Sequence, residues 1–451
     1  MTSADAPRMT AGQRLLSIGL VLGVTLVAFE VTAVVTAMPT ITDQLHGDSL
    51  YGLAVAVYTL ANMVALVAAG EFADRRGPAV PYIVSISTFI VGLVVAAAAP
   101  TMVWVVVGRT LQGAGSGGLQ PIAYTLVSRA FPAARQARMF AILSAGWVLP
   151  SLFAPALSGW VVDTFGWRWV FLGIIPFAVV VGALSVQPMR AFAPARSATA
   201  EPSRIPLAVA AAAGVGAFAT GLQMANPIAA VAVSVAGASV AVRALRRLLP
   251  TGIGRLRLGF PAIVACRIIA TAAFLGADSF IPLAADRIHH VRPLLQGMTI
   301  IGAALAWTGG QWVRSRRPVT RPDLAVRNGF LVMLLGLVLV VPVLWPGWPL
   351  WATFLGWAVG GFGMGLLFNP TTVAAMGYAT PGIEGRVSSQ LSLGDAFGFS
   401  LMGGLGGGAV ALADHTSFSI RGALGLNFAV AITLAIVGAV AASRIRPSAR
   451  L

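Results

Sequence analysis

The segment Gly108-Arg-Thr-Leu-Gln-Gly-Ala-Gly-Ser-Gly-Gly-Leu-Gln-Pro121 places one arginine and two glutamines in a run of apolar and small residues. Apolar sequence flanks it on both sides, so residues 101–128 are predicted to form one membrane-spanning helix. Arg109 then lies within the hydrocarbon, where a charge costs about 2.5 kcal/mol or more unless it has a partner or faces water. The position therefore marks Arg109 as a candidate functional residue.

The same stretch contains a G-x-G-x-x-G pattern at residues 113–118, which in soluble enzymes binds dinucleotide phosphates. That function needs a strand before the glycines, a helix that begins at them and an acid about 20 residues later. None of these is present, because apolar sequence runs straight through the pattern and the next downstream acid is Asp163. The glycines instead predict close packing between membrane helices.

Composition supports a membrane protein over a soluble one. The chain has 451 residues, of which 57% are hydrophobic and 10% are charged, whereas soluble domains carry roughly 25% charged residues. The single cysteine, Cys266, lies in an apolar run and excludes a disulfide framework or a cysteine-based metal site. We therefore expect an all-α integral membrane protein with no cofactor and no metal.

Apolar segments of membrane-spanning length recur along the whole chain. Six fall within residues 1–190, which we expect to form an N-terminal six-helix half. Residues 191–257 hold a polar linker and a two-helix hairpin, and residues 258–451 hold six more spans as a C-terminal half. The fourteen predicted spans lie near residues 14–39, 51–71, 80–99, 101–128, 137–162, 167–188, 205–224, 227–242, 259–284, 293–312, 328–345, 350–376, 387–412 and 421–443.

All of the basic residues are arginines, and the formal net charge is +16. A basic chain can bind nucleic acid, but these arginines form short clusters between apolar runs, as the positive-inside rule describes. Of the 30 arginines, 24 fall in the two termini and the loops predicted on their side, and four fall in the opposite loops. The sequence thus predicts a multi-pass protein of the cell membrane with both termini in the cytoplasm and with the lipid bilayer, not nucleic acid, as its surroundings.

An internal repeat relates the two halves. Residues 108–117 align with residues 356–365 at an offset of 356 − 108 = 248, which superimposes four glycines. The same offset carries Glu30 onto Asp278 and Gly146 onto Gly394. Duplicated halves with a central site are common in transporters, so we expect two pseudo-symmetric halves with the hairpin inserted between them.

Charged residues inside the predicted spans are few. From the helical rise of 1.5 Å per residue, Glu30 lies about 15 Å and Arg109 about 12 Å below the outer ends of their spans. The matched depths predict an ion pair that responds to protonation, or a purely structural clamp. Asp278 lies at a similar depth in the second half. Arg267 is expected on the same face of that span as Asp278, unless the Arg267 side chain extends to the cytoplasmic surface. The remaining intramembrane acid, Asp395, is either part of the cavity or locally paired.

Four motifs resemble those of the major facilitator superfamily, specifically its fourteen-span drug/proton antiporter branch. Gly70-Glu-Phe-Ala-Asp-Arg-Arg-Gly77 resembles the signature loop, although Pro78 and Ala79 replace further basic residues. Arg109-x-x-Gln112-Gly-x-Gly115 resembles the fourth-span motif, and residues 29–39 resemble the first-span motif with Glu30 in place of the commoner Asp. The fifth-span antiporter motif at residues 150–159 changes three glycines, which weakens the indication of export.

The resemblance implies a transporter that works by alternating access. It implies that Arg109 takes part in proton transfer and that the acid and arginine of the signature loop, Asp74 and Arg75, latch neighbouring helices; with Gly70 and Gly77 they are the expected gate. We expect Glu30 to carry the proton, Arg109 to modulate it, and Asp278 to be a second acid or a substrate contact. Candidate cavity residues are Gln112, Trp147, Asp278, Trp357 and Asp395, although the two tryptophans also suit simple packing.

The expected function is proton-coupled export of small amphipathic molecules by a monomer, with the substrate and protons as its partners. Uptake by proton symport, or a non-transporting sensor or scaffold on the same fold, are the alternatives. An enzyme is least expected, because no nucleophile and base pair, metal cluster or nucleotide loop is found outside the charged spans.

Overall fold

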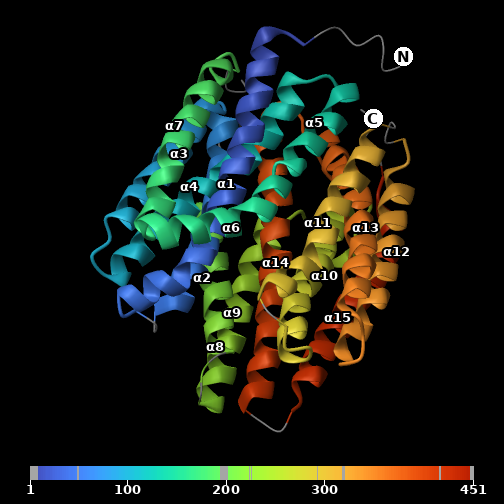
Figure 1. The fold of residues 1–451 in the computed structure, drawn as a ribbon. Helices are drawn as coiled ribbons and strands as arrows, with labels where there is room; N and C mark the ends of the chain where they lie inside the picture. The colour runs from blue at the N-terminus through green and yellow to red at the C-terminus, as the bar shows by residue number, and fades with distance from the viewer. Residues whose placement is uncertain are drawn as a thin grey trace. The chain divides into compact units, whose positions relative to one another are not determined.

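The computed structural model describes residues 9–47, 50–192, 202–222, 224, 226–291, 293–316, 320–415 and 418–446. All regular structure in these ranges is helical, with fifteen α-helices, three short 3₁₀ helices and no strand (Figure 1). The predicted all-α class is therefore confirmed. The α-helices are α1 (Ala11–Gln44), α2 (Tyr51–Arg76), α3 (Ala79–Ala97), α4 (Met102–Ala130), α5 (Ala133–Ala145), α6 (Val148–Phe165), α7 (Arg168–Met189), α8 (Ile205–Gly221), α9 (Pro227–Leu248), α10 (Phe260–Arg287), α11 (Pro293–Ser315), α12 (Pro322–Val340), α13 (Leu350–Gly377), α14 (Glu384–His415) and α15 (Ile420–Ala441).

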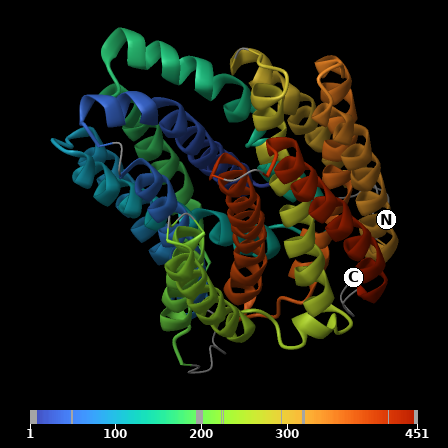
Figure 2. The same cartoon turned by 90° about the horizontal axis from the view of Figure 1, so that it is seen from below.

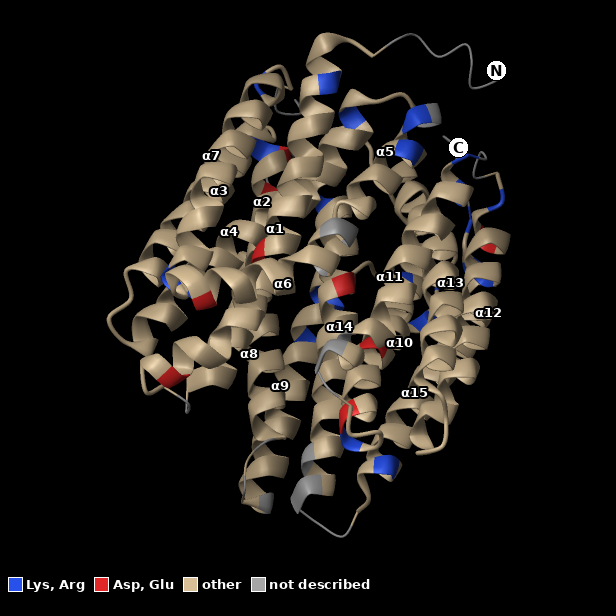
Figure 3. Cartoon of the chain, in the orientation of Figure 1, with Lys and Arg blue, Asp and Glu red and all other residues tan. Residues whose placement is uncertain are grey.

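Nine helices in the described ranges are long and apolar enough to cross a membrane, and two shorter apolar helices accompany them. Charged side chains are sparse along the helices, most of whose length carries none (Figure 3). The chain is therefore a multi-pass membrane protein. The count of fourteen spans stays a prediction.

The segment expected as one span over residues 137–162 is instead two helices, α5 and α6. The helix stops at Ala145, and Gly146 and Trp147 form a turn before α6 begins at Val148. Pro150 explains the break, because it has no N–H to donate to the carbonyl of Gly146 and its ring collides with that carbonyl in a continuous helix. Within the first turn of α6 the same proline is tolerated.

The chain divides into two compact units. The first comprises Met1–Ala212 together with Ala379–Ser392, and the second comprises Ala213–Tyr378 together with Leu393–Leu451. The first turns of α14 thus group with the first unit, while the rest of that helix groups with the second. The boundaries predicted at residues 190 and 257 follow the sequence repeat and stay a prediction.

Helix α4 lies between α2 and α3 in the first unit, and glycines on two of its faces allow the close approach. A Cβ on Gly113 or Gly117 would meet backbone atoms of Tyr58 or Asn62 on α2. A Cβ on Gly108 or Gly115 would meet backbone atoms of α3. These contacts confirm that the glycine-rich stretch packs helices, as small residues do in membranes.

The second unit repeats this arrangement with α13 between α11 and α12. Gly361 and Gly365, the counterparts of Gly113 and Gly117, face the backbone of α11. The counterparts of Gly108 and Gly115 are Gly356 and Gly363, which face α12. All four aligned glycines therefore face the equivalent neighbouring helix, as expected of a repeat at an offset of 248.

Helices α8 and α9 run side by side as a hairpin (Figures 1 and 2). Gly214 lies against the backbone of Gly237 and Ala241, and Gly221 lies against Ser234. The side chain of Asn226 accepts hydrogen bonds from the N–H groups of residues 228 and 229, which caps the start of α9. The insertion of the α8–α9 hairpin in the membrane stays a prediction.

We expect Gly361→Ala to destabilise the second unit by about 1–3 kcal/mol, because the new methyl group would overlap the backbone of Ala303 on α11. The thermal unfolding midpoint of the purified protein in detergent measures this. Gly309→Ala is the matched control, since no atom lies within 4 Å of its Cβ position and alanine favours a helix. Equal midpoints for the two variants would contradict the close-packing argument.

Candidate functional site

Glu30 on α1 and Arg109 on α4 form a buried ion pair in the first unit. Arg109 Nη1 donates to Glu30 Oε1 and, at 2.7 Å, to Gln112 Oε1. Glu30 is 0% exposed and Arg109 is 3% exposed. The Gln112 amide in turn donates to the carbonyl of Gly92 on α3 at 3.3 Å. Because Arg109 and Gln112 are three residues apart on one helix, they lie on the same face.

The structure therefore brings together three residues that the sequence marked as functional. The expected ion pair is present, and it gives the buried Arg109 charge the partner that a charge in hydrocarbon needs. The ring of Tyr58 on α2 adds a cation–π contact, with its centroid 4.2 Å from Arg109 Cζ. The role of the pair in coupling stays a prediction.

Asp278 on α10 occupies the equivalent place in the second unit. Its Oδ1 accepts a hydrogen bond of 2.6 Å from the indole Nε1 of Trp357 on α13. Trp357 is 0% exposed and stacks on Phe274 at 4.8 Å between ring centroids. Within the described residues, no arginine forms an ion pair with Asp278.

The offset of 248 that relates Glu30 to Asp278 also relates Arg109 to Trp357. In both units the first helix of the half thus carries an acid that receives a hydrogen bond from the same position of the fourth helix. The donor is a cation in one unit and a neutral indole in the other. The two carboxyl groups consequently lie in different electrostatic surroundings.

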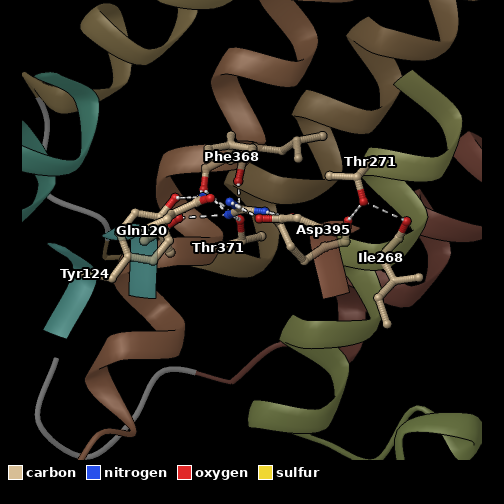
Figure 4. A network of polar contacts seen from close by, with 10 residues as sticks. Gln120, Tyr124, Ile268, Thr271, Phe368, Thr371 and Asp395 are labelled. Atoms are coloured by element: carbon tan, nitrogen blue, oxygen red, sulfur yellow. Dashed lines mark hydrogen bonds and ion pairs between the residues drawn. The ribbon is translucent and has the colours of Figure 1, made fainter. Parts of the chain in front are cut away.

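Arg267 on α10 binds Asp395 on α14 through two hydrogen bonds, of 2.6 Å from Nε and 3.0 Å from Nη2 (Figure 4). Its Nη1 donates to Thr371 and Thr372 and to the carbonyl of Phe368, all on α13. Arg267 is 0% exposed, whereas the Asp395 side chain is 17% exposed. A bidentate, buried pair of this kind holds three helices of the second unit together.

Sequence reasoning placed Arg267 on the same face as Asp278, or at the cytoplasmic surface. The structure pairs it with Asp395, and it does not reach the surface. No sequence signal joined Arg267 to Asp395, because they are 128 residues apart and belong to no shared motif. Trp147, the other aromatic cavity candidate, lies at the turn before α6 and is 42% exposed.

Asp74, at the end of α2, caps the start of α14 within the first unit. Its two oxygens accept hydrogen bonds from the backbone N–H groups of Gly385, at 2.7 Å, and Arg386, at 2.8 Å. These N–H groups are in the first turn of α14, where they have no partner in the helix. The positive end of the helix dipole also favours a carboxylate there.

Two glycines make this cap possible. A Cβ on Gly70 would meet the Gly385 carbonyl, and a Cβ on Gly385 would meet the Gly70 carbonyl. Gly77 ends α2 with a φ of 78°, a conformation that glycine adopts readily. Arg75 forms an ion pair of 2.9 Å with Glu71 one turn earlier. The four predicted gate residues thus lie at one end of α2.

Three residues near these sites were not predicted from the sequence. Arg129 on α4 forms an ion pair of 2.9 Å with Glu384 and lies 3.9 Å from Asp74. Both Arg129 and Glu384 lie outside the predicted spans, where charge is ordinary. Tyr58 lies within the predicted span at residues 51–71 and belongs to none of the motifs. Within the described residues, no group of three or more His, Cys, Asp or Glu side chains could hold a metal ion.

Comparison with known proteins gives the family. The profile of the Major Facilitator Superfamily matches residues 20–316. A probable multidrug-efflux transporter of Mycobacterium tuberculosis is 29% identical over 449 residues, covering 91% of this chain and 92% of its own. An uncharacterized MFS-type transporter of the same species is 29% identical over an alignment of 307 residues that covers 64% of this chain. The match spans 44% of that second relative's length.

The fold is shared with solved transporters. The crystal structure of a human organic anion transporter matches with a TM-score of 0.74, covers 96% of this chain and 100% of its own, and is 14% identical. At that identity the likeness establishes the fold and not the substrate.

We expect Asp74→Ala to quicken hydrogen exchange at the amides of Gly385 and Arg386 about fivefold, because a lost helix cap costs about 1 kcal/mol. Hydrogen exchange with mass spectrometry on the detergent-solubilised protein measures this. Asp74→Asn is the matched variant, since its amide oxygen still accepts one bond and should retain part of the protection. Unchanged exchange in Asp74→Ala would show that the cap does not protect α14.

We expect Arg267→Leu and Asp395→Leu each to destabilise the second unit by about 3–5 kcal/mol, because each leaves a buried charge without its partner. The double variant removes both charges and should recover much of that loss. Thermal unfolding of the single and double variants in detergent tests this. Additive losses would mean that the two side chains do not stabilise each other.

Proposed function

Because the chain belongs to the major facilitator superfamily, we propose that it is a proton-coupled secondary transporter that exports small amphipathic molecules by alternating access. Its similarity to a probable multidrug-efflux transporter over nine-tenths of its length supports export of this kind. Members of this superfamily are transporters of small molecules and not enzymes. One proton that moves down a potential of 100 mV supplies about 2.3 kcal/mol, enough for roughly a fifty-fold gradient.

The observation that carries the proposal is the charge balance of the buried acids. Glu30 is paired with Arg109, and Asp395 is paired with Arg267. Among the residues that the structure describes, Asp278 has a neutral indole as its donor and no arginine in an ion pair with it. An isolated carboxylate is costly in hydrocarbon, so it must take up either a proton or a cation. The surroundings of Asp278 therefore favour binding of a proton or of a cationic substrate.

Glu30 is the proposed proton carrier and Arg109 its modulator. When Glu30 is ionised, the pair holds α1 to α4 through a charge-assisted hydrogen bond. When it is protonated, Arg109 keeps its charge but loses its counter-ion, which favours a different arrangement of the two helices. Gln112 also accepts from Arg109 and so offers it an alternative partner.

Asp278 is the proposed second acid or substrate contact, with Trp357 as its donor. Trp147 and Asp395 complete the proposed cavity residues, since each retains some exposure. The proposed gate is the cap formed by Asp74 on α14, with Gly70, Arg75 and Gly77 beside it. Breaking two charge-assisted hydrogen bonds releases the start of α14, which suits a contact that opens and closes during a cycle.

We further propose fourteen spans, with α8 and α9 as the inserted hairpin and both termini in the cytoplasm. The distribution of arginines, 24 against four, supports this orientation and a place in the cell membrane. We propose a monomer, in which each chain holds its own coupling acids. Uptake by proton symport is the second candidate, and the altered fifth-span motif at residues 150–159 favours it. A sensor or scaffold on the same fold is the third.

We expect Glu30→Gln to abolish substrate-driven proton movement, because the amide cannot exchange a proton at this site. Proteoliposomes with an internal pH dye, an imposed proton gradient and a panel of lipophilic cations, neutral drugs and organic anions measure it. Asp278→Asn is tested in parallel, and it should weaken the response to cations more than to neutral compounds. Asp323→Asn, at the partly buried start of α12, is the control.

Opposite movement of substrate and protons supports export, and movement in the same direction supports uptake. If Glu30→Gln responds like the native protein, Glu30 is structural and the coupling site must be sought at Asp278. If the native protein is silent across the panel while folded, the proposed substrate class is wrong.

A further inference from the structure

Tyr58 on α2 lies directly against the ion pair but plays no part in the function described so far. Its ring packs under the guanidinium of Arg109, and its side chain is buried, with the residue 7% exposed. Its hydroxyl faces both the Glu30 carboxylate and Ser116 of α4. It makes no hydrogen bond with either. A buried hydroxyl without a partner costs about 1–3 kcal/mol, so its presence needs an explanation.

Glu30 has a matching deficiency. Arg109 binds Glu30 Oε1, whereas Oε2 is buried and has no hydrogen-bond partner. A carboxylate oxygen accepts, and a tyrosine hydroxyl both donates and accepts. The Tyr58 hydroxyl and Glu30 Oε2 are thus complementary polar atoms of two interacting side chains, and both are buried without a hydrogen bond.

Polar contacts continue from Tyr58 towards the less buried part of the interface between α2 and α4. Ser116 is 2% exposed, and its hydroxyl donates to the carbonyl of Gly113 at 3.2 Å. Asn62, one turn after Tyr58 on α2, donates to the same hydroxyl at 3.1 Å. Asn62 is only half-buried. The polar line therefore runs from a fully buried acid to a partly exposed amide.

The close packing of α4 against α2 brings these polar side chains together. Tyr58 and Asn62 are the residues whose backbone lies against Gly113 and Gly117. Both pairs are spaced by four residues, so they share one face of each helix. Ser116 lies between the two glycines, and the close approach that they permit brings its hydroxyl within reach of α2.

We propose that Tyr58 and Ser116 form a hydroxyl relay that carries the proton between Glu30 and the Asn62 end of the interface between α2 and α4. The relay rests on the proposed proton coupling at Glu30. In the inward step, the Tyr58 O–H proton passes to Glu30 Oε2 as the Ser116 O–H proton passes to the Tyr58 oxygen. The Ser116 oxygen takes a proton from a hydronium ion at the Asn62 end, which leaves as water. The Tyr58 and Ser116 oxygens each lose one proton and gain one, and the net change is the addition of one proton to the Glu30 carboxylate, which becomes neutral.

Among the described residues, two titratable groups face Glu30, Arg109 from α4 and Tyr58 from α2. Helices α5, α6 and α7 also pack against α1. Their charged groups in the described ranges do not act on Glu30; these are Arg135, Arg138, Asp163 and Arg168. Arg109 has no proton to exchange at ordinary pH, which leaves Tyr58 as the group that can deliver one.

The test is Tyr58→Phe, which keeps the ring beneath Arg109 and removes the hydroxyl. In the proteoliposome assay, we expect substrate-driven proton flux to fall at least roughly tenfold, with substrate binding unchanged. Tyr82→Phe is the matched control. Tyr82 is a buried tyrosine of the same unit whose hydroxyl bonds Ser185 at 3.0 Å, away from Glu30. It should cost at least as much stability and leave proton flux near the native rate.

A second measurement needs no substrate. In pH-difference infrared spectra of the purified protein, the carbonyl band of protonated Glu30 is assigned by its loss in Glu30→Gln. We expect Tyr58→Phe to shift this band to higher frequency, because protonated Glu30 can no longer form the hydrogen bond to the Tyr58 oxygen that the relay requires, and Tyr82→Phe to leave it in place. If Glu30→Gln abolishes flux but Tyr58→Phe leaves both flux and band unchanged, the relay is wrong and the coupling site stands. If Glu30→Gln leaves flux and the carbonyl spectrum unchanged, the coupling site fails and the relay fails with it.

Discussion

The close approach of α4 to α2 and α3 is the constraint on which the first unit depends. Membrane helices gain little from the hydrophobic effect when they associate, so their contacts must come from van der Waals packing and from polar pairs. Gly113 and Gly117 allow close van der Waals packing, because the backbone of α2 lies directly against them. Arg109 provides the polar pair by binding Glu30 of α1. Any side chain at the glycines would push the helices apart and leave the arginine without the short contacts that make its burial tolerable.

The second unit has the same frame with one changed residue at its centre. Four glycines of α13 face the same neighbours as their counterparts on α4. The arginine of the first unit is replaced by Trp357, whose indole gives one hydrogen bond to Asp278 and no charge. The two units therefore share their helix packing but not the type of donor that binds the buried acid. One acid is held by a counter-ion and the other by a neutral donor, so protonation has a different consequence at each.

Helical structure and the pairing of Glu30 with Arg109 could be predicted because each depends on local pattern or on depth along a helix. A run of apolar residues fixes a span, and two opposite charges at equal depth must meet or find water. The partner of Arg267 could not be predicted in this way. Spacing along α10 places it relative to Asp278 on the same helix, but its partner Asp395 comes from α14, and only the packing of three helices selects it. The break between α5 and α6 depends on a single proline, Pro150, whose position within an apolar run gives no hydropathy signal.

The ends of α2 and α14 connect the proposed gate to the buried polar sites. Helix α2 carries Asp74 at one end and Tyr58 four to five turns earlier, while α14 carries Gly385 in the first unit and Asp395 in the second. Gly385 and Asp395 are ten residues apart, about 15 Å along a continuous helix. In the proposed gate, release of the cap frees the first turns of α14, and the Arg267 pair would respond only if α14 moved as one rigid body. Gly394 lies immediately before Asp395, and a glycine weakens a helix interior, so the sequence of α14 itself bears on whether the cap and the Arg267 pair can act together.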